Sequence, residues 1–262
     1  MNIHSMRTLL TIATFISTFT LTAQKKDSLP PNVYHWKELK LQKESDDLKR
    51  FILKGSTTTL SSFEVTAYTL SPGNTTASIF KHDDLEELMI IKEGAAKITI
   101  NDKSRILGPG SIAFVMPGDN HAMENAGSTD AIVFVLKYKG KLPDHERGKN
   151  GGGSFMLDWN ELKTINTGKG YRRDFFNRAT SQLAQFEMHT TALDADSVSH
   201  TPHTHVQEEI ILLLRGNVTM HINGNLLPVE AGDLVFLPSR IPHALLNTGK
   251  EQCEYFAFQW KN

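Results

Sequence analysis

The sequence predicts an all-β protein whose two halves resemble each other, each half being a sandwich or barrel of short strands. Short apolar runs recur along the chain, separated by turn signals such as Asn223-Gly224 and without an intervening helical pattern. Blocks of residues also recur at a nearly constant distance, which indicates an internal duplication. Together these observations predict two tandem all-β domains.

The duplicated blocks keep their order along the chain. At a spacing of 123 residues, Trp36-Lys-Glu-Leu39-Lys40 recurs as Trp159-Asn-Glu-Leu162-Lys163, and Leu60-Ser-Ser-Phe63-Glu64 recurs as Leu183-Ala-Gln-Phe186-Glu187. Further on the spacing is 122 residues, and the matched pairs are Glu87 with Glu209, Gly94 with Gly216, Gly110 with Gly232, His121 with His243 and Asn125 with Asn247. One residue was therefore gained or lost between the two sets of blocks.

Each half contains several segments of strand character. In the second half these are 209–214, 218–222, 226–229, 234–237 and 254–260, and in the first half 87–92, 97–100, 112–116 and 131–138. Regularly spaced strands of this kind are typical of sandwiches and barrels, among them the jelly roll.

The first 23 residues are predicted to be a signal peptide. Arg7 precedes an uncharged apolar run from Leu9 to Leu21, and Ala23 offers a small residue for cleavage. The alternative is an uncleaved membrane anchor, although this run is short for spanning a bilayer. We therefore expect a periplasmic or secreted protein that does not contact the membrane after cleavage.

The rest of the chain divides into four predicted parts. Residues 24–58 form an N-terminal arm with a short helix near 43–51, and 59–140 form the first domain. Residues 141–158 contain Pro143 and three consecutive glycines and are predicted to be a linker or exposed loop, and 159–262 form the second domain.

Composition excludes several functions. A net charge of -1 argues against nucleic acid as a partner, and 39% hydrophobic and 22% charged residues are ordinary for a globular protein. The single cysteine, Cys253, excludes an internal disulfide and a site made of several thiolates. Any bound metal must therefore use nitrogen and oxygen ligands.

The residues with the clearest chemistry lie in the second half. His203 and His205 stand two apart and Glu209 four further on, so an extended strand would carry all three on one face. Gly216, then Gly232 to Pro238, then His243 and Asn247 follow at defined spacings.

These motifs resemble the two conserved motifs of the cupin superfamily, the first running His-x-His through Glu to Gly and the second from Gly through Pro to His and Asn. One residue departs from the pattern, since Arg240 stands where a glycine is usual. The resemblance covers both halves and implies a bicupin, that is, two tandem jelly-roll β-barrels.

The resemblance implies that His203, His205, Glu209 and His243 bind one divalent transition metal. Imidazole and carboxylate ligands suit Mn, Fe, Zn or Ni without selecting among them. Four protein ligands on a six-coordinate ion would leave two positions for water or substrate, which favours catalysis over a structural role. His200 is either a supporting or entry residue for this site or an exposed loop histidine.

The first half is predicted to be a degenerate barrel. With the spacing of 122, Lys81 and Asp83 take the places of His203 and His205, whereas Glu87 and His121 are kept. His82 is one residue out of register and would point to the opposite face unless a bulge re-aims it. The sequence therefore favours a metal-free first barrel, in which a Lys81–Glu87 salt bridge replaces the cation and whose role is packing and homodimerisation. Metal binding through His82, Glu87 and His121 stays open.

The architecture also resembles the ureidoglycine aminohydrolases, bicupins whose manganese lies in the second barrel. That family has Glu, His, His and Gln at the spacings of the four ligands here, so two of the four types differ. Its substrate-contacting Tyr and Lys would fall near Tyr255 and Gln259, and only the Tyr is kept. Tyr255 and Gln259 are accordingly our candidate catalytic residues.

Three functions are compatible with this sequence. The leading hypothesis is an exported metal-dependent hydrolase or isomerase acting on a small oxygen-rich molecule such as a sugar acid, with Arg215 as either a further pocket residue or part of a turn. A second is a cupin dioxygenase, which needs an apolar pocket that Phe186, Met188 and Met220 could line. The third is a module that binds a small ligand without catalysis.

Overall fold

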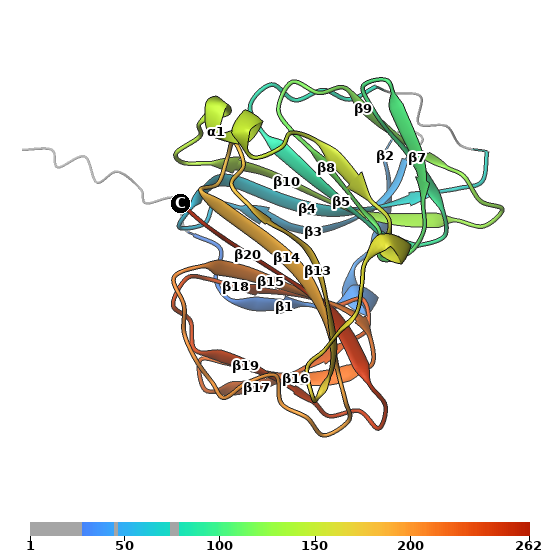
Figure 1. The fold of residues 1–262 in the computed structure, drawn as a ribbon. Coiled ribbons are helices and arrows are strands. Elements are labelled where there is room, and N and C mark those ends of the chain that lie inside the picture. Colours follow the sequence, from blue (N-terminus) through green and yellow to red (C-terminus); the bar gives the residue numbers. More distant parts are fainter. Residues whose placement is uncertain (1–27, 45–46, 74–78) are drawn as a thin grey trace, which may run out of the picture.

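The computed structural model describes residues 28–44, 47–73 and 79–262, and it consists of two β-barrels that pack side by side (Figure 1). Within these ranges the helical elements are the six-residue α1 (His145–Asn150) and two single 3-10 turns, Trp36–Glu38 and Trp159–Glu161. The predicted all-β fold of two tandem jelly rolls is confirmed.

Each barrel is made of one seven-stranded and one three-stranded sheet. In domain 1 the orders are β11-β8-β5-β10-β4-β3-β2 and β7-β6-β9, and in domain 2 they are β1-β18-β15-β20-β14-β13-β12 and β17-β16-β19. The pairings between the named strands are antiparallel, and an isolated bridge between Ser28 and Ser56 is parallel. The strands of domain 1 are β2 (Leu41–Glu44), β3 (Asp47–Gly55), β4 (Leu60–Leu70), β5 (Glu86–Glu93), β6 (Ala96–Ile100), β7 (Lys103–Leu107), β8 (Ile112–Val115), β9 (His121–Asn125), β10 (Ala131–Gly140) and β11 (Phe155–Leu157). Those of domain 2 are β1 (Asn32–Tyr34), β12 (Ile165–Asn166), β13 (Gly170–Arg178), β14 (Gln185–Leu193), β15 (Glu208–Arg215), β16 (Asn217–Ile222), β17 (Asn225–Glu230), β18 (Leu234–Leu237), β19 (His243–Asn247) and β20 (Cys253–Lys261).

Every segment predicted as a strand is a strand in the structure. The prediction of a short helix near residues 43–51 is wrong. Of that segment, residues 43–44 end β2 and residues 47–51 begin β3, which pairs with both β2 and β4. Leu48, Phe51 and Ile52 stand at helical spacing, but pairing with the eleven-residue β4 decides the structure, because tertiary context overrides local pattern.

The two domains exchange one edge strand. β1, which precedes domain 1 in the chain, pairs with β18 of domain 2, and β11, which precedes domain 2, pairs with β8 of domain 1. In Figure 1 the blue β1 accordingly lies beside the orange strands β15 and β18. The predicted arm and linker therefore each contribute a strand to the neighbouring barrel.

A tryptophan follows each exchanged strand and packs on a glycine of the barrel that the strand has joined. A Cβ on Gly110 would lie 2.4 Å from the Trp159 ring, and one on Gly232 would lie 3.0 Å from the Trp36 ring. Both glycines have positive φ angles, 84° and 96°. The Trp-x-Glu-Leu repeat in the sequence thus marks the docking point of each exchanged strand.

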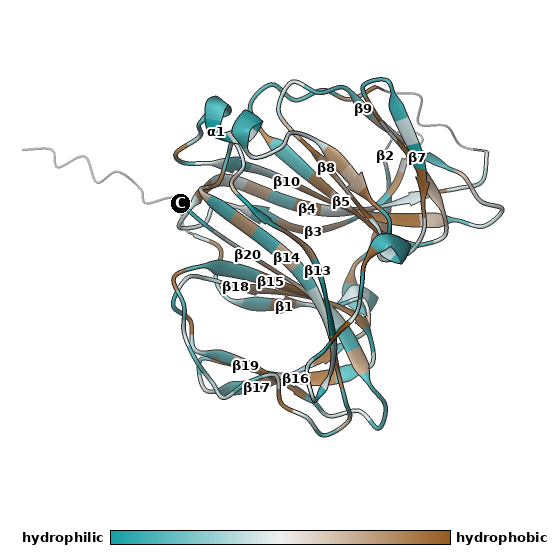
Figure 2. Ribbon diagram, viewed as in Figure 1, coloured by the Kyte–Doolittle hydropathy of each residue, from teal (hydrophilic) through white to brown (hydrophobic). Residues whose placement is uncertain are grey.

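The hydrophobic residues form three clusters. Two fill the interiors of the barrels, and the largest lies between the two seven-stranded sheets, with members from both domains such as Phe63, Phe134, Phe236 and Phe256. Figure 2 shows brown segments along the strands of both large sheets, whereas α1 is hydrophilic. Among the described residues, the largest cluster is therefore shared by the two domains.

Buried carboxylates tie the domains together at the edge of this shared core. Glu208 of β15 accepts hydrogen bonds from Thr57 Oγ1 at 2.7 Å, from the Thr58 amide at 2.7 Å and from Trp260 Nε1 at 2.9 Å. Its counterpart Glu86 accepts bonds from the Ser181 amide and hydroxyl at 2.8 and 2.7 Å. Each carboxylate holds the segment that leads into the other domain's sheet.

The predicted signal peptide, residues 1–23, lies outside the described residues. Among the residues that are described, no helix is long and apolar enough to cross a membrane.

Candidate metal centre

The predicted metal ligands of domain 2 come from three neighbouring segments. His203 and His205 lie in the loop before β15, Glu209 is the second residue of β15, and His243 begins β19. A pair of backbone hydrogen bonds, His203 N–H to the His243 carbonyl at 3.2 Å and the reverse at 3.0 Å, fixes the loop against β19. The imidazole rings of His203, His205 and His243 consequently lie with centroids 4.7 to 5.3 Å apart.

Two of these rings face the same carboxylate oxygen. Nε2 of His205 lies 3.2 Å and Nε2 of His243 lies 3.1 Å from Oε2 of Glu209. Two ligand atoms bound about 2.0 to 2.2 Å from one ion lie about 3.0 to 3.4 Å apart. The observed distances therefore fit three ligands of one cation, and they equally fit hydrogen bonds from the two rings to the carboxylate.

The partner of the Nδ1 atom in each ring shows which ring nitrogen carries the proton. Nδ1 of His205 lies 3.0 Å from the Gln207 carbonyl oxygen, and Nδ1 of His243 lies 2.9 Å from the Ile241 carbonyl oxygen. Because a carbonyl only accepts, Nδ1 carries the proton and Nε2 of a neutral ring presents a lone pair. That lone pair faces an acceptor, Glu209, so a proton or a metal ion must lie between them. Carbonyl partners of this kind are the usual support of metal-binding histidines.

The burial of Glu209 strengthens this conclusion. The residue is 4% exposed, and burial would raise its pKa, but the His205 and His243 imidazoles lower that pKa to about 2. The carboxylate therefore stays ionised in a poorly solvated place, where protons on the two imidazoles or a bound cation balance its charge.

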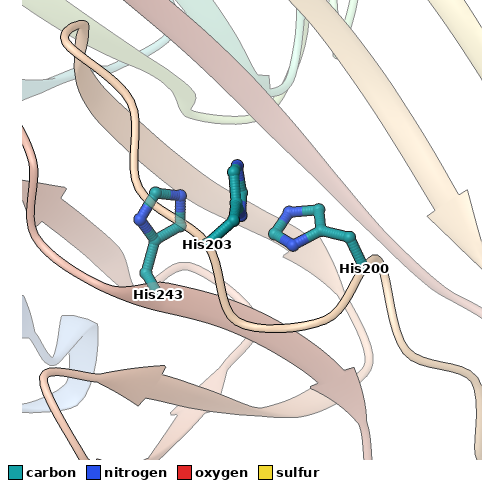
Figure 3. A group of neighbouring side chains, drawn as sticks. All are labelled: His200, His203 and His243. Atoms are coloured by element: carbon teal, nitrogen blue, oxygen red, sulfur yellow. The ribbon is translucent and has the colours of Figure 1, made fainter.

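His203 belongs to a second, overlapping group with His200 and His243. The ring nitrogens of these three residues approach one another within 4.8 Å, as do the ligand atoms of His205, Glu209 and His243. Figure 3 shows the three rings gathered above the loop and β19. Burial lowers the pKa values of His200 and His203, which favours the neutral imidazoles that bind metals. The structure thus brings the four predicted ligands together as two triads that share His243, and it adds His200 as a neighbour.

A cavity of about 480 Å³ opens over the centre, and three of the four predicted ligands, His203, Glu209 and His243, line it. The predicted catalytic residues Tyr255 and Gln259 also line this cavity, from the inner face of β20. Burial raises the pKa of Tyr255, so its hydroxyl remains a proton donor at neutral pH. Gln259 pairs with both Glu187 and Glu209 across the sheet and presents an uncharged amide beside the centre.

Several pocket residues escaped the sequence analysis. Lys169, Arg172, Glu187 and His189 line the same cavity, from β13, β14 and the turn before β13. His189 lies 3.5 Å from Glu187, and this neighbour lowers the pKa of the Glu187 carboxyl. Only the sheet order β20-β14-β13 brings these residues to the metal ligands, and no sequence motif marks that order.

The structure places the apolar candidates and Arg215, which the sequence left open. Phe186 and Met188 pack into the cluster between the two domains, and only Met220 of the three apolar candidates lines the cavity. Arg215 lies outside this cavity and donates to Glu254 at 3.2 Å and to Gln252 Oε1 at 2.8 Å. Of the three apolar candidates of the dioxygenase hypothesis, Met220 thus lines the cavity over the centre, together with Leu193, Ile211 and Leu245.

The structure also corrects the alignment of the two halves near the first barrel's site. Phe80 bridges His121 as His203 bridges His243, and the His82 carbonyl accepts from the Gly118 amide as the His205 carbonyl accepts from the Arg240 amide, both at 2.7 Å. His82 is therefore the counterpart of His205, and Phe80, not Lys81, is the counterpart of His203. The one-residue change in spacing lies between His82 and Glu87.

The expected Lys81–Glu87 salt bridge is absent. The Lys81 ammonium lies 3.5 Å from Asp83 instead, and the cation near Glu87 is Lys137, whose Nζ lies 3.8 Å from Oε2. The same comparison explains Arg240, whose φ angle of 63° repeats the positive φ of Gly118. A glycine is usual there because the backbone is left-handed.

Comparison with known proteins agrees with the fold. (S)-Ureidoglycine aminohydrolase from Arabidopsis thaliana is 22% identical over 178 residues, which are 67% of this chain and 57% of that protein, so the chain spans less than two thirds of this relative. Protein Ylba from E. coli superposes with a TM-score of 0.68 at 18% identity, covering 91% of this chain and 94% of the other. A mutant oxalate decarboxylase from Bacillus subtilis superposes with a TM-score of 0.67 at 15% identity, covering 91% and 79%. The two structural likenesses show the fold alone.

The chain matches the family model of the cupin domain. This model matches twice, at residues 67–137 and 190–258, which together are more than half of the chain and correspond to one match in each barrel. The chain therefore belongs to the cupin family, as a bicupin with one cupin domain in each half.

Proposed function

We propose that this protein is an exported, metal-dependent enzyme of the hydrolase or isomerase type that acts on a small oxygen-rich acid, such as a sugar acid. One observation carries the proposal: Nε2 of His205 and of His243 face the same buried oxygen of Glu209 at the wall of an open cavity. A divalent ion of Mn, Fe, Zn or Ni fits this set of nitrogen and oxygen ligands.

The ion would polarise a substrate carbonyl or lower the pKa of a bound water. The chain's own residues would position the substrate. Arg172 and Lys169 bring positive charge to the cavity wall, which favours an anionic substrate, and Tyr255 offers a hydroxyl that keeps its proton. The cavity of about 480 Å³ suits a small molecule.

The similarity to named enzymes supports this class of substrate. One relative is named for ureidoglycine and one structural neighbour for oxalate, both of which are small carboxylic acids. The Gln259 amide stands where the aminohydrolase family places a lysine, so we propose a substrate different from ureidoglycine.

Metal analysis of the natively purified protein tests the central claim. We expect a stoichiometric divalent transition metal in the wild type and its loss from domain 2 in His205→Ala. A wild type without stoichiometric metal, or full retention in the variant, would contradict the proposal. The exposed His145, in α1, supplies a matched control, His145→Ala, which should keep the metal.

The reaction itself requires a metabolite screen on the metal-loaded protein. Turnover of unsaturated or simple uronates without oxygen consumption is the expected result. Thermal stabilisation by such acids without any product would instead indicate a ligand-binding module. Export is tested separately by sequencing the N-terminus of the protein from the periplasm or the medium, where we expect Gln24 as the first residue.

A further inference from the structure

We propose that the first barrel holds a second divalent cation on His82, Glu87 and His121, and that the Lys137 ammonium competes with this ion for the Glu87 carboxylate. This inference concerns the domain that the sequence marked as degenerate, and it does not depend on the reaction proposed for domain 2.

The ligand geometry of the first barrel repeats that of the second. Nε2 of His82 lies 3.2 Å and Nε2 of His121 lies 3.4 Å from Oε2 of Glu87, against 3.2 and 3.1 Å for the corresponding atoms of domain 2. The Nδ1 atom of His121 faces the Asp119 carbonyl, as Nδ1 of His243 faces that of Ile241, although at a longer 3.4 Å. Three of the four predicted ligand positions of domain 2 thus have a counterpart in domain 1 with similar geometry.

The three converging atoms have no other partner. Nε2 of His82, Oε2 of Glu87 and Nε2 of His121 are all buried, and none makes a hydrogen bond of acceptable geometry. Glu87 is 3% and His121 is 2% exposed, so bulk solvent does not reach these side chains. Buried polar atoms without partners are costly and rare, and one cation between these three would satisfy all of them.

The fourth position explains why this site differs from that of domain 2. Phe80 stands where domain 2 has His203, and its ring stacks on His121 with centroids 6.0 Å apart. A three-ligand set binds a metal more weakly than a four-ligand set but leaves one more position for water. We therefore expect the second ion to be the weaker of the two.

Lys137 is the competing cation. It pairs with Glu87 across the sheet, as Gln259 pairs with Glu209, and its Nζ lies 3.8 Å from the carboxylate and 5.8 Å from the centre of the Phe80 ring. A divalent ion bound to Glu87 would lie within a few ångströms of this ammonium and be repelled by it. The Lys137 side chain is 24% exposed, so it can turn towards solvent when a metal enters.

The repeat supplies the variant that tests this competition. Lys137→Gln gives domain 1 the residue that domain 2 has at the same place, and Glu87→Gln removes the shared carboxylate with little change in shape. Both are compared with the wild-type full chain by equilibrium dialysis against Zn²⁺ and, separately, Mn²⁺. Circular dichroism and thermal denaturation confirm that each variant is folded.

The wild type should bind two ions per chain, the second more weakly. Lys137→Gln should tighten the second site by at least about tenfold, and Glu87→Gln should bind one ion with the affinity of the stronger site. The proposal is overturned if neither His243→Ala nor His243→Ala combined with Lys137→Gln binds an ion, or if the weaker ion survives in Glu87→Gln. Adding His243→Ala to each protein separates the sites: the weaker ion should remain in that background even if domain 2 proves not to bind metal.

Discussion

Nε2 of His243 lies 3.1 Å from Oε2 of Glu209, while the other nitrogen of the same ring faces a backbone carbonyl oxygen. Both nitrogens of the imidazole therefore have a neighbour, one the backbone and the other the Glu209 carboxylate, with a proton or a metal ion between ring and carboxylate. His243 is also the residue that the two histidine-containing triads of domain 2 share. Its removal should consequently be more damaging than that of any other ligand.

The first prediction follows from this position. His243→Ala should lower the metal affinity of domain 2 by about 100-fold or more, since even residues that only support a ligand contribute about 10- to 100-fold. His200→Ala, which removes a member of one triad only, should have a smaller effect. Inductively coupled plasma mass spectrometry after dialysis measures both. Equal losses in the two variants would show that His200 is itself an essential ligand.

Tyr255 should act on the substrate without holding the metal. In Tyr255→Phe we expect unchanged metal content and melting temperature, because the ring still fills its buried place, and a kcat lower by about 10²-fold or more if the hydroxyl transfers a proton. Steady-state kinetics on the substrate found in the metabolite screen provide the measurement. A change in KM alone would mean that the hydroxyl only binds the substrate.

Glu208 should contribute to the stability of the whole chain. Its carboxylate accepts bonds from the Thr57 hydroxyl, the Thr58 amide and the Trp260 indole in a buried place between the domains. Glu208→Gln replaces one accepting oxygen by a donor, and we expect a loss of about 2 to 4 kcal/mol in the free energy of unfolding. Urea denaturation measures this loss, and the exposed Glu251→Gln should change it by less than about 0.5 kcal/mol.

Gly110 should tolerate no side chain. A Cβ there would lie 2.4 Å from the Trp159 ring, and the φ angle of 84° is itself unfavourable for alanine. Gly110→Ala should lower the melting temperature by several degrees, corresponding to about 2 kcal/mol or more. Gly108→Ala is the matched control, because a Cβ at Gly108 would meet nothing within 4 Å. Similar melting temperatures for the two variants would show that the Trp159 contact can relax at little cost.

Cys253 should be unreactive in the folded protein. Its side chain is fully buried, and burial raises the pKa of the thiol. The reactive thiolate is therefore scarce at neutral pH. It forms in quantity only above the ordinary thiol pKa or after unfolding. The disulfide reagent DTNB should release less than about a tenth of an equivalent of thiolate from the native protein at pH 7.5. One equivalent should appear in guanidinium chloride. Rapid reaction of the native protein would reveal local opening around β20.

Much of the fold could be predicted because local and repeated signals agreed. The Asn223-Gly224 turn, the alternation along β16 and β17, and the recurrence of the Trp36 block at Trp159 all describe neighbours in the chain or in the repeat. The exchange of β1 and β11 had no such signal. Strand pairing between segments about 200 residues apart is decided by tertiary packing, which no short motif encodes.

In the site, too, residues within a short motif could be predicted from the sequence, whereas relations between distant segments could not. His203, His205, Glu209 and His243 stand at a spacing with a known geometric meaning, so they could be chosen from the sequence. The first barrel was misaligned because the inserted residue lies between His82 and Glu87, in a loop where no matched residue marks its place. Backbone hydrogen bonds from Gly118 and Arg240 located it.

The exchange of β1 and β11 makes the two halves equivalent to the subunits of a strand-swapped dimer that a peptide linker has joined. In such a dimer, dilution separates the partners, whereas here the linker keeps each exchanged strand at a high effective concentration near its sheet. A single proteolytic nick near Gly152 would therefore leave the two fragments associated, because each still carries a strand of the other's barrel. Either fragment made alone would expose an unpaired edge on β8 or β18 and the apolar face of the shared core, and would be prone to aggregate.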